Sequence, residues 1–277
     1  ALIVTDSVFS MDGDVAPLLE IVELAERHRL RTLVDEAHAT GTLGPGGRGA
    51  LAEAGLEDQV DVIVGTLGKA LGSYGAFVAC DQQMARYLVN AARTFIFSTA
   101  LPPPAVAAAL AALELLQERP RRVEKLAAHA AALRGALEAE GFYVGESRTQ
   151  ILPLVIGEAQ RAMRICEAAL ARGVFAQAIR PPTVPPMTSR LRLAVMATHG
   201  EEELRAAGRT LGAVARAHGF EPRAAFAGGG AATGVSTRTL DREAHPRYHP
   251  EPDFASGPPP RAGVFDFEAP GRARRAA

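Results

Sequence analysis

The sequence has little of what extracellular, metal-binding and nucleic-acid-binding proteins need. Its 277 residues include two cysteines, Cys80 and Cys166, and carry a formal net charge of −1, with 30 Lys and Arg against 31 Asp and Glu. Two cysteines cannot form a disulfide framework or a zinc cluster, which predicts a protein of the reducing cytoplasm. Balanced charge excludes the basic surface of a nucleic-acid binder. No apolar run approaches the ~18 residues of a membrane span, so we expect neither nucleic acid nor membrane as a partner.

Lysine is scarce as well. Of the 30 basic residues only Lys69 and Lys125 are lysines, and all the others are arginines. Lys125 lies in a pattern that predicts a helix with a polar face, where a solvated lysine is ordinary. Lys69 stands among glycines, in GTLGKALG (65–72), and therefore needs another explanation.

The order of apolar and helical patterns predicts an α/β fold. Strand-like runs alternate with helical patterns over the first hundred residues, which favours a mainly parallel sheet covered on both faces. We expect strands over 2–4, 31–35, 60–65 and 75–79 and helices over 15–27, 82–92, 105–117 and 122–140. The first helix follows Asp14 and carries Pro17 in its first turn. Shorter strands (151–155, 174–179, 191–194) and helices (160–172, 201–218) predict a smaller α+β unit.

The two ends of the chain have their own character. The chain opens without Met, in a run that reads as a strand already under way, and we expect a piece of a longer protein. Residues 224–277 hold 7 Gly and 7 Pro and show no sustained periodicity, which predicts disorder. His245 and His249 in this tail have a spacing that could suit a metal, but no other ligand is near, and solvated side chains are the simpler interpretation.

Two groups of reactive side chains follow predicted strands. The first is Asp35-Glu36-Ala37-His38, and the second is the loop that carries Lys69. Because loops after the carboxyl ends of parallel strands line one crevice, an acid, an imidazole and an amine can meet there.

Three interpretations of these groups compete. In the first, Asp35 caps a turn and Lys69 is solvated. In the second, Asp-Glu-Ala-His is the metal box of a nucleotide hydrolase, but Ile63 and Ala70 occupy the positions where a phosphate-binding loop needs Gly and Ser or Thr. The third is a pyridoxal-phosphate (PLP) site, which needs a lysine amine, a carboxylate for the pyridine nitrogen and hydroxyls for the phosphate. Lys69 and Asp35 supply the first two, and Thr66 and Ser10 supply hydroxyls.

Several segments together resemble the α-oxoamine synthases, fold-type-I PLP enzymes that join an amino acid to an acyl thioester with loss of carbon dioxide. In order along residues 1 to about 223 they are SVFSMDGD (7–14), VDEAH (34–38), GGRG (46–49), TLGK (66–69) and FST (97–99). IRPPTVP (179–185) followed by RLRL (190–193) is most similar to the biotin-pathway branch. The resemblance implies that 1–118 is the C-terminal part of the PLP-binding large domain and 119–223 a small C-terminal domain with its connecting helix.

The resemblance also implies a role for individual residues. Lys69 holds PLP covalently and then moves the Cα proton, Asp35 pairs with the pyridinium nitrogen, and His38 hydrogen-bonds the phenolic oxygen. Ser10 lies near that oxygen, and Thr66 contacts the phosphate. Thr99 reaches the phosphate of the other subunit in a homodimer. Arg180 holds the substrate carboxylate, and Thr183 lines the substrate site. Ser10 and Thr183 as turn residues and His38 as a core histidine stay open as alternatives. Arg192, in a strand, is expected to be a structural ion-pair partner.

The reaction implied for this branch joins L-alanine to a pimeloyl thioester, carried by coenzyme A or an acyl carrier protein. Two alternatives remain: a relative that uses glycine or serine with another acyl-CoA, and a truncated relative that binds no cofactor. Family members carry a long N-terminal portion, with part of the cofactor site, ahead of the segments seen here.

Overall fold

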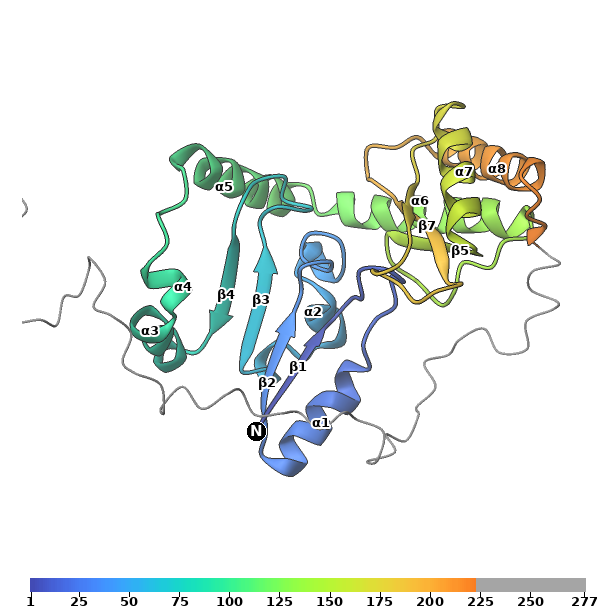
Figure 1. The fold of residues 1–277 in the computed structure, drawn as a ribbon. Coiled ribbons are helices and arrows are strands. Elements are labelled where there is room, and N and C mark those ends of the chain that lie inside the picture. The colour runs from blue at the N-terminus through green and yellow to red at the C-terminus, as the bar shows by residue number, and fades with distance from the viewer. Residues whose placement is uncertain (223–277) are drawn as a thin grey trace, which may run out of the picture. The chain divides into compact units, whose positions relative to one another are not determined.

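A computed structural model gives the structure of the chain and describes residues 1–222. The predicted tail over 224–277, with His245 and His249, lies outside the described residues. Residues 1–222 belong to one compact unit. Its described part contains a four-stranded sheet, called here the large sheet, and a three-stranded one, the small sheet (Figure 1).

The large sheet has its strands in sequence order: β1 (Leu2–Asp6), β2 (Arg31–Asp35), β3 (Val62–Thr66) and β4 (Ala76–Cys80). The first three are parallel, and α1 (Leu18–His28) forms the crossover between β1 and β2. β4 runs antiparallel to β3, because the loop over 67–75 is too short to carry the chain back to the other end of the sheet. The large sheet is therefore mainly parallel, as predicted.

Helices cover one face of the large sheet. α1 and α2 (Ala50–Ala54) bury apolar side chains against Val34 and Ile63, which the strand register places side by side. On the other face Val4 is 62% exposed and Val78 50% exposed. Parallel sheets are ordinarily covered on both faces, and residues 1–222 meet that expectation on one face only.

Three helices follow β4: α3 (Gln82–Ala91), α4 (Arg93–Ile96) and α5 (Pro103–Glu118). Of their residues only Ala109 is buried within the described part of the chain. Phe95 (67% exposed), Val106 (51%) and Leu110 (57%) face outward. Large exposed apolar side chains, when they form a contiguous patch, are typical of binding surfaces.

The small sheet has the order β5-β7-β6 and is antiparallel throughout. Its strands are β5 (Ile151–Gly157), β6 (Gln177–Ile179) and β7 (Ser189–Ala194), and the accompanying helices are α6 (Arg121–Ala139), α7 (Ala159–Leu170) and α8 (Glu201–Ala217). Leu137, Leu152, Leu191 and Leu211 form the centre of their shared core. The predicted domain boundary at 118/119 falls in the turn between α5 and α6 and stays a prediction.

The structure differs from the predicted elements at two places near the candidate site. The first helix begins at Leu18, after an N-cap at Pro17, because Val15 pairs with Val8 in a β-bridge. The Asp14 carboxylate therefore does not cap it. In addition, the short helix α2 follows the GGRG segment (46–49). The sequence did not reveal it, because it is only five residues long and stands between Gly49 and Gly55.

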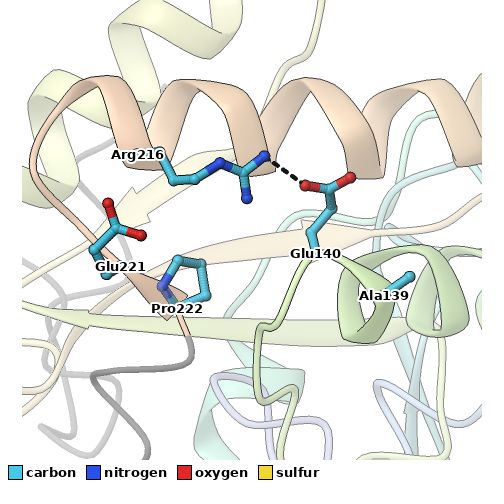
Figure 2. Close-up of a pocket in the computed structure, with 5 residues that line it drawn as sticks. All are labelled: Ala139, Glu140, Arg216, Glu221 and Pro222. Carbon is cyan, nitrogen blue, oxygen red and sulfur yellow. Dashed lines mark hydrogen bonds and ion pairs between the residues drawn. The ribbon is translucent and has the colours of Figure 1, made fainter.

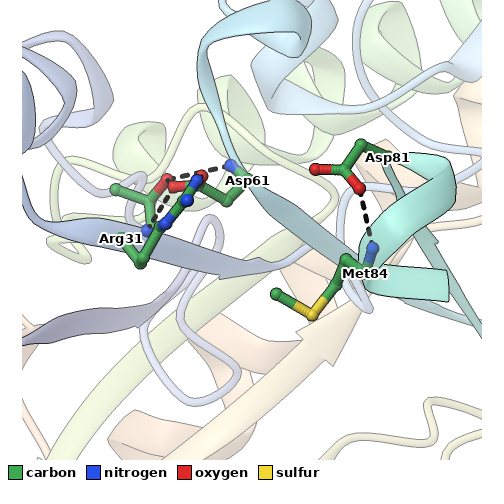
Figure 3. A network of polar contacts seen from close by, with 5 residues as sticks. Arg31, Asp61, Asp81 and Met84 are labelled. Atoms are coloured by element: carbon green, nitrogen blue, oxygen red, sulfur yellow. Dashed lines mark hydrogen bonds and ion pairs between the residues drawn. The ribbon is translucent and has the colours of Figure 1, made fainter. Parts of the chain in front are cut away.

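The starts of β2 and β3 are tied by side chains, as Figure 3 shows. Asp61 binds Arg31 and accepts hydrogen bonds from the Thr32 amide (2.8 Å) and hydroxyl (3.2 Å). Nearby, Asp81 caps α3 by accepting from the Met84 amide at 2.7 Å. These bonds lie at the amino ends of the parallel strands, so they fix the sheet and leave its carboxyl end to other side chains.

Within residues 1–222, no helix combines the length and the apolar character that a membrane crossing requires.

Candidate active site

The carboxyl ends of three neighbouring parallel strands bring the predicted reactive residues together. Asp6 ends β1, Asp35 ends β2 and Thr66 ends β3, with Asp6 and Asp35 in register. The turn after β2 carries His38, and the loop after β3 carries Lys69. This is the edge at which α/β sheets bind their ligands.

Lys69 and His38 are in direct contact. The Lys69 Nζ atom lies 3.0 Å from His38 Nε2, although 31 positions separate the residues in the sequence. Burial, helped by the Lys69 and Arg192 cations and opposed by Asp35, lowers the pKa of His38 to about 4. The imidazole is therefore neutral at pH 7 and can accept a hydrogen bond from the amine.

The Lys69 amine is itself electrostatically perturbed. The residue as a whole is exposed, but partial burial of its amine end lowers its pKa, against the opposing effect of Asp35 and Asp6. A lowered pKa increases the fraction of neutral amine, which is the form that attacks a carbonyl or accepts a proton. Lys125 lies on α6, away from these strand ends.

Asp35 is held with one carboxylate oxygen free. Its Oδ1 atom accepts the Ala37 amide at 2.7 Å, and its carbonyl oxygen accepts the Ser7 amide at 2.9 Å. Within the described residues no donor reaches Oδ2. The side chain is thus oriented by its own turn and keeps an acceptor for a ligand.

The loop over 67–75 is a tight turn that presents Lys69. The Leu67 amide donates to Gly75 O (2.9 Å) and the Ser73 amide to Leu67 O (2.8 Å). The Thr66 hydroxyl donates to Gly75 O at 3.2 Å and accepts the Gly68 amide at 3.1 Å. A phosphate contact by Thr66 would require its hydroxyl to turn away from Gly75, and this role stays a prediction.

The loop after β1 is fixed by the small sheet. Arg192 Nε donates to Ser10 O, Arg190 pairs with Asp12, and the Thr149 hydroxyl donates to Gly13 O at 3.0 Å. The Ser10 hydroxyl has no partner among residues 1–222, so it is free for the predicted contact near the cofactor's phenolic oxygen.

Arg192 corrects one expectation. Among the described residues it pairs with no carboxylate; its neighbour Arg190 does so instead, with Asp12. Arg192 is half-buried, burial lowers its pKa, and its cation acts on both His38 and Lys69. Its two terminal nitrogens bind nothing in the described part of the chain. The period-2 pattern Arg190-Leu191-Arg192-Leu193 was the signal that both arginines leave the same face of a strand.

Three other predicted residues are not joined to this group. Arg180 and Thr183 are exposed in the segment after β6, where the Thr183 amide donates to Arg180 O at 3.1 Å. Thr99 is exposed between α4 and α5. No described hydrogen bond or ion pair connects any of them to Lys69, His38 or Asp35, and their roles stay predictions.

Glu36 is a site residue whose role the sequence did not reveal. It is 2% exposed, and its carboxylate accepts the Ala50 and Leu51 amides, each at 2.9 Å. A Cβ at Gly49 would lie 2.0 Å from Glu36 Oε2, which explains a glycine there. The GGRG segment therefore packs against the buried carboxylate beneath the His38 turn.

Neither a metal cluster nor a pocket elsewhere in residues 1–222 offers a better candidate for the active site. Residues 1–222 hold no cluster of three His, Cys, Asp or Glu side chains that could bind a metal ion. A cavity of about 250 Å³ lies between α6 and the end of α8, lined by Ala139, Glu140, Arg216, Glu221 and Pro222 (Figure 2). The Glu140–Arg216 ion pair occupies its polar side, and none of the predicted site residues reaches it.

Comparison with known proteins identifies the family of the chain. The sequence model of "Aminotransferase class I and II" matches residues 1–211. An 8-amino-7-oxononanoate synthase of Anaeromyxobacter dehalogenans is 51% identical over 203 residues, which are 73% of this chain and 51% of that protein. One of Citrifermentans bemidjiense is 50% identical over 205 residues, 73% of this chain and 53% of that protein. The chain spans about half the length of these curated relatives.

Solved structures give the same fold. A serine palmitoyltransferase of S. paucimobilis, with a PLP–myriocin aldimine bound, superposes with a TM-score of 0.75 at 35% identity, over 79% of this chain and 55% of that one. An 8-amino-7-oxononanoate synthase of Francisella tularensis has a TM-score of 0.69 at 25% identity, over 79% and 64%. These neighbours confirm the predicted fold class and the resemblance to the α-oxoamine synthases.

Proposed function

The chain belongs to the class I and II aminotransferase family, and on that premise we propose that it forms part of a PLP-dependent acyltransferase. The proposed reaction joins L-alanine to a pimeloyl thioester, with loss of carbon dioxide, to give 8-amino-7-oxononanoate for biotin biosynthesis. Curated relatives of that name, at 51% and 50% identity, support it. Because the chain spans half of those relatives, the proposal concerns the whole enzyme to which these residues contribute.

The contact between Lys69 and His38 is the observation that carries the proposal. PLP, when bound, supplies an electron sink for negative charge at the substrate Cα. The Lys69 amine, with its lowered pKa, holds the cofactor and takes the Cα proton. The neutral His38 imidazole, 3.0 Å away, orients that amine.

Asp35 serves the cofactor's ring nitrogen. The Ala37 amide fixes one of its oxygens, and the other accepts a hydrogen bond from the protonated nitrogen. A carboxylate at this position favours the protonated ring, since an opposite charge stabilises the charged form. The residues present therefore suit the cofactor: Lys69 would bind its aldehyde carbon, Asp35 its ring nitrogen, and His38 and Ser10 its phenolic oxygen.

Two arginines compete for the substrate carboxylate. Arg180 is proposed from the family resemblance, whereas Arg192 is favoured because its cation acts on both His38 and Lys69. A guanidinium with two unengaged nitrogens matches a carboxylate bidentately, which lysine cannot copy. We assign the carboxylate to Arg192 and the outer part of the substrate site to Arg180 and Thr183.

Arginine-to-lysine variants separate the two assignments. Arg192→Lys should weaken L-alanine binding by about 1–3 kcal/mol, the range for a hydrogen bond to a charged group, while Arg180→Lys changes it little. Titrating the absorbance of the PLP-loaded protein with L-alanine measures both. The reverse order of effects would return the carboxylate to Arg180.

The same titration tests the substrate. L-Alanine should change the cofactor band at lower concentration than glycine or L-serine, and only the alanine-treated protein should respond to a pimeloyl thioester. A productive response with glycine or serine would keep the family and reject the biotin-pathway assignment. A chain that takes up no PLP would favour the inactive relative.

The proposed partners are the two small-molecule substrates and a second copy of the chain. The acyl group arrives on coenzyme A or an acyl carrier protein. A homodimer with Thr99 reaching the partner's phosphate site is supported by the exposed apolar side chains of α4 and α5 that flank it. A cytoplasmic location stays a prediction, in keeping with the two free thiols.

A further inference from the structure

Gln150, on the segment leading into β5, connects the small sheet to the turn that carries His38. Its Nε2 atom donates to the His38 carbonyl oxygen at 2.9 Å, across 112 positions of sequence. Its own carbonyl oxygen accepts the Val195 amide at 2.9 Å, so the backbone of Gln150 is anchored just beyond β7. The backbone position from which the Gln150 side chain extends is therefore fixed.

The other bonds of the His38 turn are local, apart from the Gly41 amide, which donates to Gly47 O at 2.7 Å. The Ala39 and Thr40 amides donate to Glu36 O at 2.9 and 2.7 Å, and the Thr42 hydroxyl donates to His38 O at 2.8 Å. These bonds give the turn its shape but do not fix its position relative to β7. Among the side chains of residues 1–222, Gln150 alone reaches the backbone of 37–42 from the small sheet.

The side-chain amide of Gln150 has one buried atom without a hydrogen-bond partner, which costs free energy of folding. Because a carbonyl only accepts, the atom facing His38 O must be Nε2, and the other amide atom is Oε1. Oε1 is buried, and no donor in the described part of the chain reaches it. A buried acceptor without a partner is unfavourable, so an apolar side chain would suit this position better if the bond to His38 did nothing.

We infer that Gln150 is a positioning residue for His38: its bond to the His38 carbonyl holds the imidazole against the Lys69 amine. The charged groups that act on that imidazole are Lys69, Arg192 and Asp35. Release of the turn would let the imidazole move toward water and away from both cations. The consequence for the cofactor rests on the proposed function; the position of the imidazole does not.

The test replaces the amide without changing its length. In Gln150→Met the side chain keeps its reach but has no donor, and the pKa of His38, read from its imidazole C–H resonance by NMR, should rise by about one unit or more toward 6.5. His38→Asn assigns the resonance among the 7 histidines. Gln83→Met is the matched control, since Gln83 is exposed on α3 and its side chain has no partner among residues 1–222.

Two results would overturn the inference: an unchanged His38 pKa in a folded Gln150→Met protein, or an equal rise in Gln83→Met. If Gln150→Met does not fold by circular dichroism, Gln150→Leu takes its place under the same criteria. In PLP-loaded protein, the pH midpoint of the cofactor band should shift in the Gln150 variant alone. A wild-type chain that takes up no PLP rejects the proposed function, while the imidazole measurement still decides the role of Gln150.

Discussion

At the scale of residues, the neutral state of His38 governs the site. The folded pKa, about 4, lies below the ordinary value of 6.5. The unfolded chain therefore binds the proton first as the pH falls, and the fold loses stability between about pH 6.5 and 4. Above pH 6.5 both states are neutral, and the imidazole makes no pH-dependent contribution.

A variant isolates this contribution from that of the carboxylates. His38→Asn should lose less stability than the wild type between pH 7 and pH 4.5, by about 1–2 kcal/mol after allowance for a half-exposed group. Urea unfolding of both proteins at the two pH values measures the difference. Equal losses would show that His38 titrates in the fold as it does in water.

The reactive residues were predictable in part, for a physical reason. Lys69, Asp35 and His38 follow strands, and the rule that parallel strands end at one edge brings them together. The split between Arg190 and Arg192 was not predictable, because both leave the same face of β7 and only the position of Asp12 decides which is paired. The role of Glu36 was not predictable either, because the partners of its carboxylate are backbone amides of α2, which no sequence pattern marks.

At the scale of elements, the loop after β1 depends on a glycine. Gly13 has φ +71°, and a Cβ there would lie 2.3 Å from Ile151 O and 2.7 Å from Ser147 Oγ. The loop that carries Ser10 thus lies directly against the segment leading into β5. A side chain at Gly13 would force the two apart.

Gly13→Ala and Gly46→Ala form a matched pair. Gly46 also has a positive φ (+61°), but nothing lies within 4 Å of its added Cβ. The Gly46 variant should lose about 1 kcal/mol from backbone strain alone, and the Gly13 variant clearly more. Urea unfolding compares them, and equal losses would mean that the contact with Ile151 is not tight in solution.

Element types were predicted better than their ends or directions. The alternation of apolar runs located β1, β2 and β3. The antiparallel direction of β4 could have been predicted as well, because the loop over 67–75 is too short for a crossover. The start of α1 was missed because the Val8–Val15 bridge, a tertiary contact, withdraws Val15 from the helix.

At the scale of the molecule, the exposed apolar side chains on and next to α4 and α5 are the most informative feature. Phe95 is 67% exposed on α4, and Phe97, just after it, 73%. If a second copy packs there, as proposed, Phe95→Ser with Phe97→Ser should shift sedimentation velocity toward the monomer. Phe175→Ser is the control, since Phe175 is 72% exposed in the segment before β6. A double variant that sediments like the wild type would place the partner surface elsewhere.

Whether Lys69 is the residue that holds PLP can be tested directly. The chain offers only two lysines, and Lys125 is the internal control. PLP-loaded protein is reduced with borohydride, which makes the link to the cofactor permanent, then digested and mapped by mass spectrometry. We expect the pyridoxyl adduct on the peptide that contains Lys69. An adduct on Lys125, or on neither lysine, would contradict it.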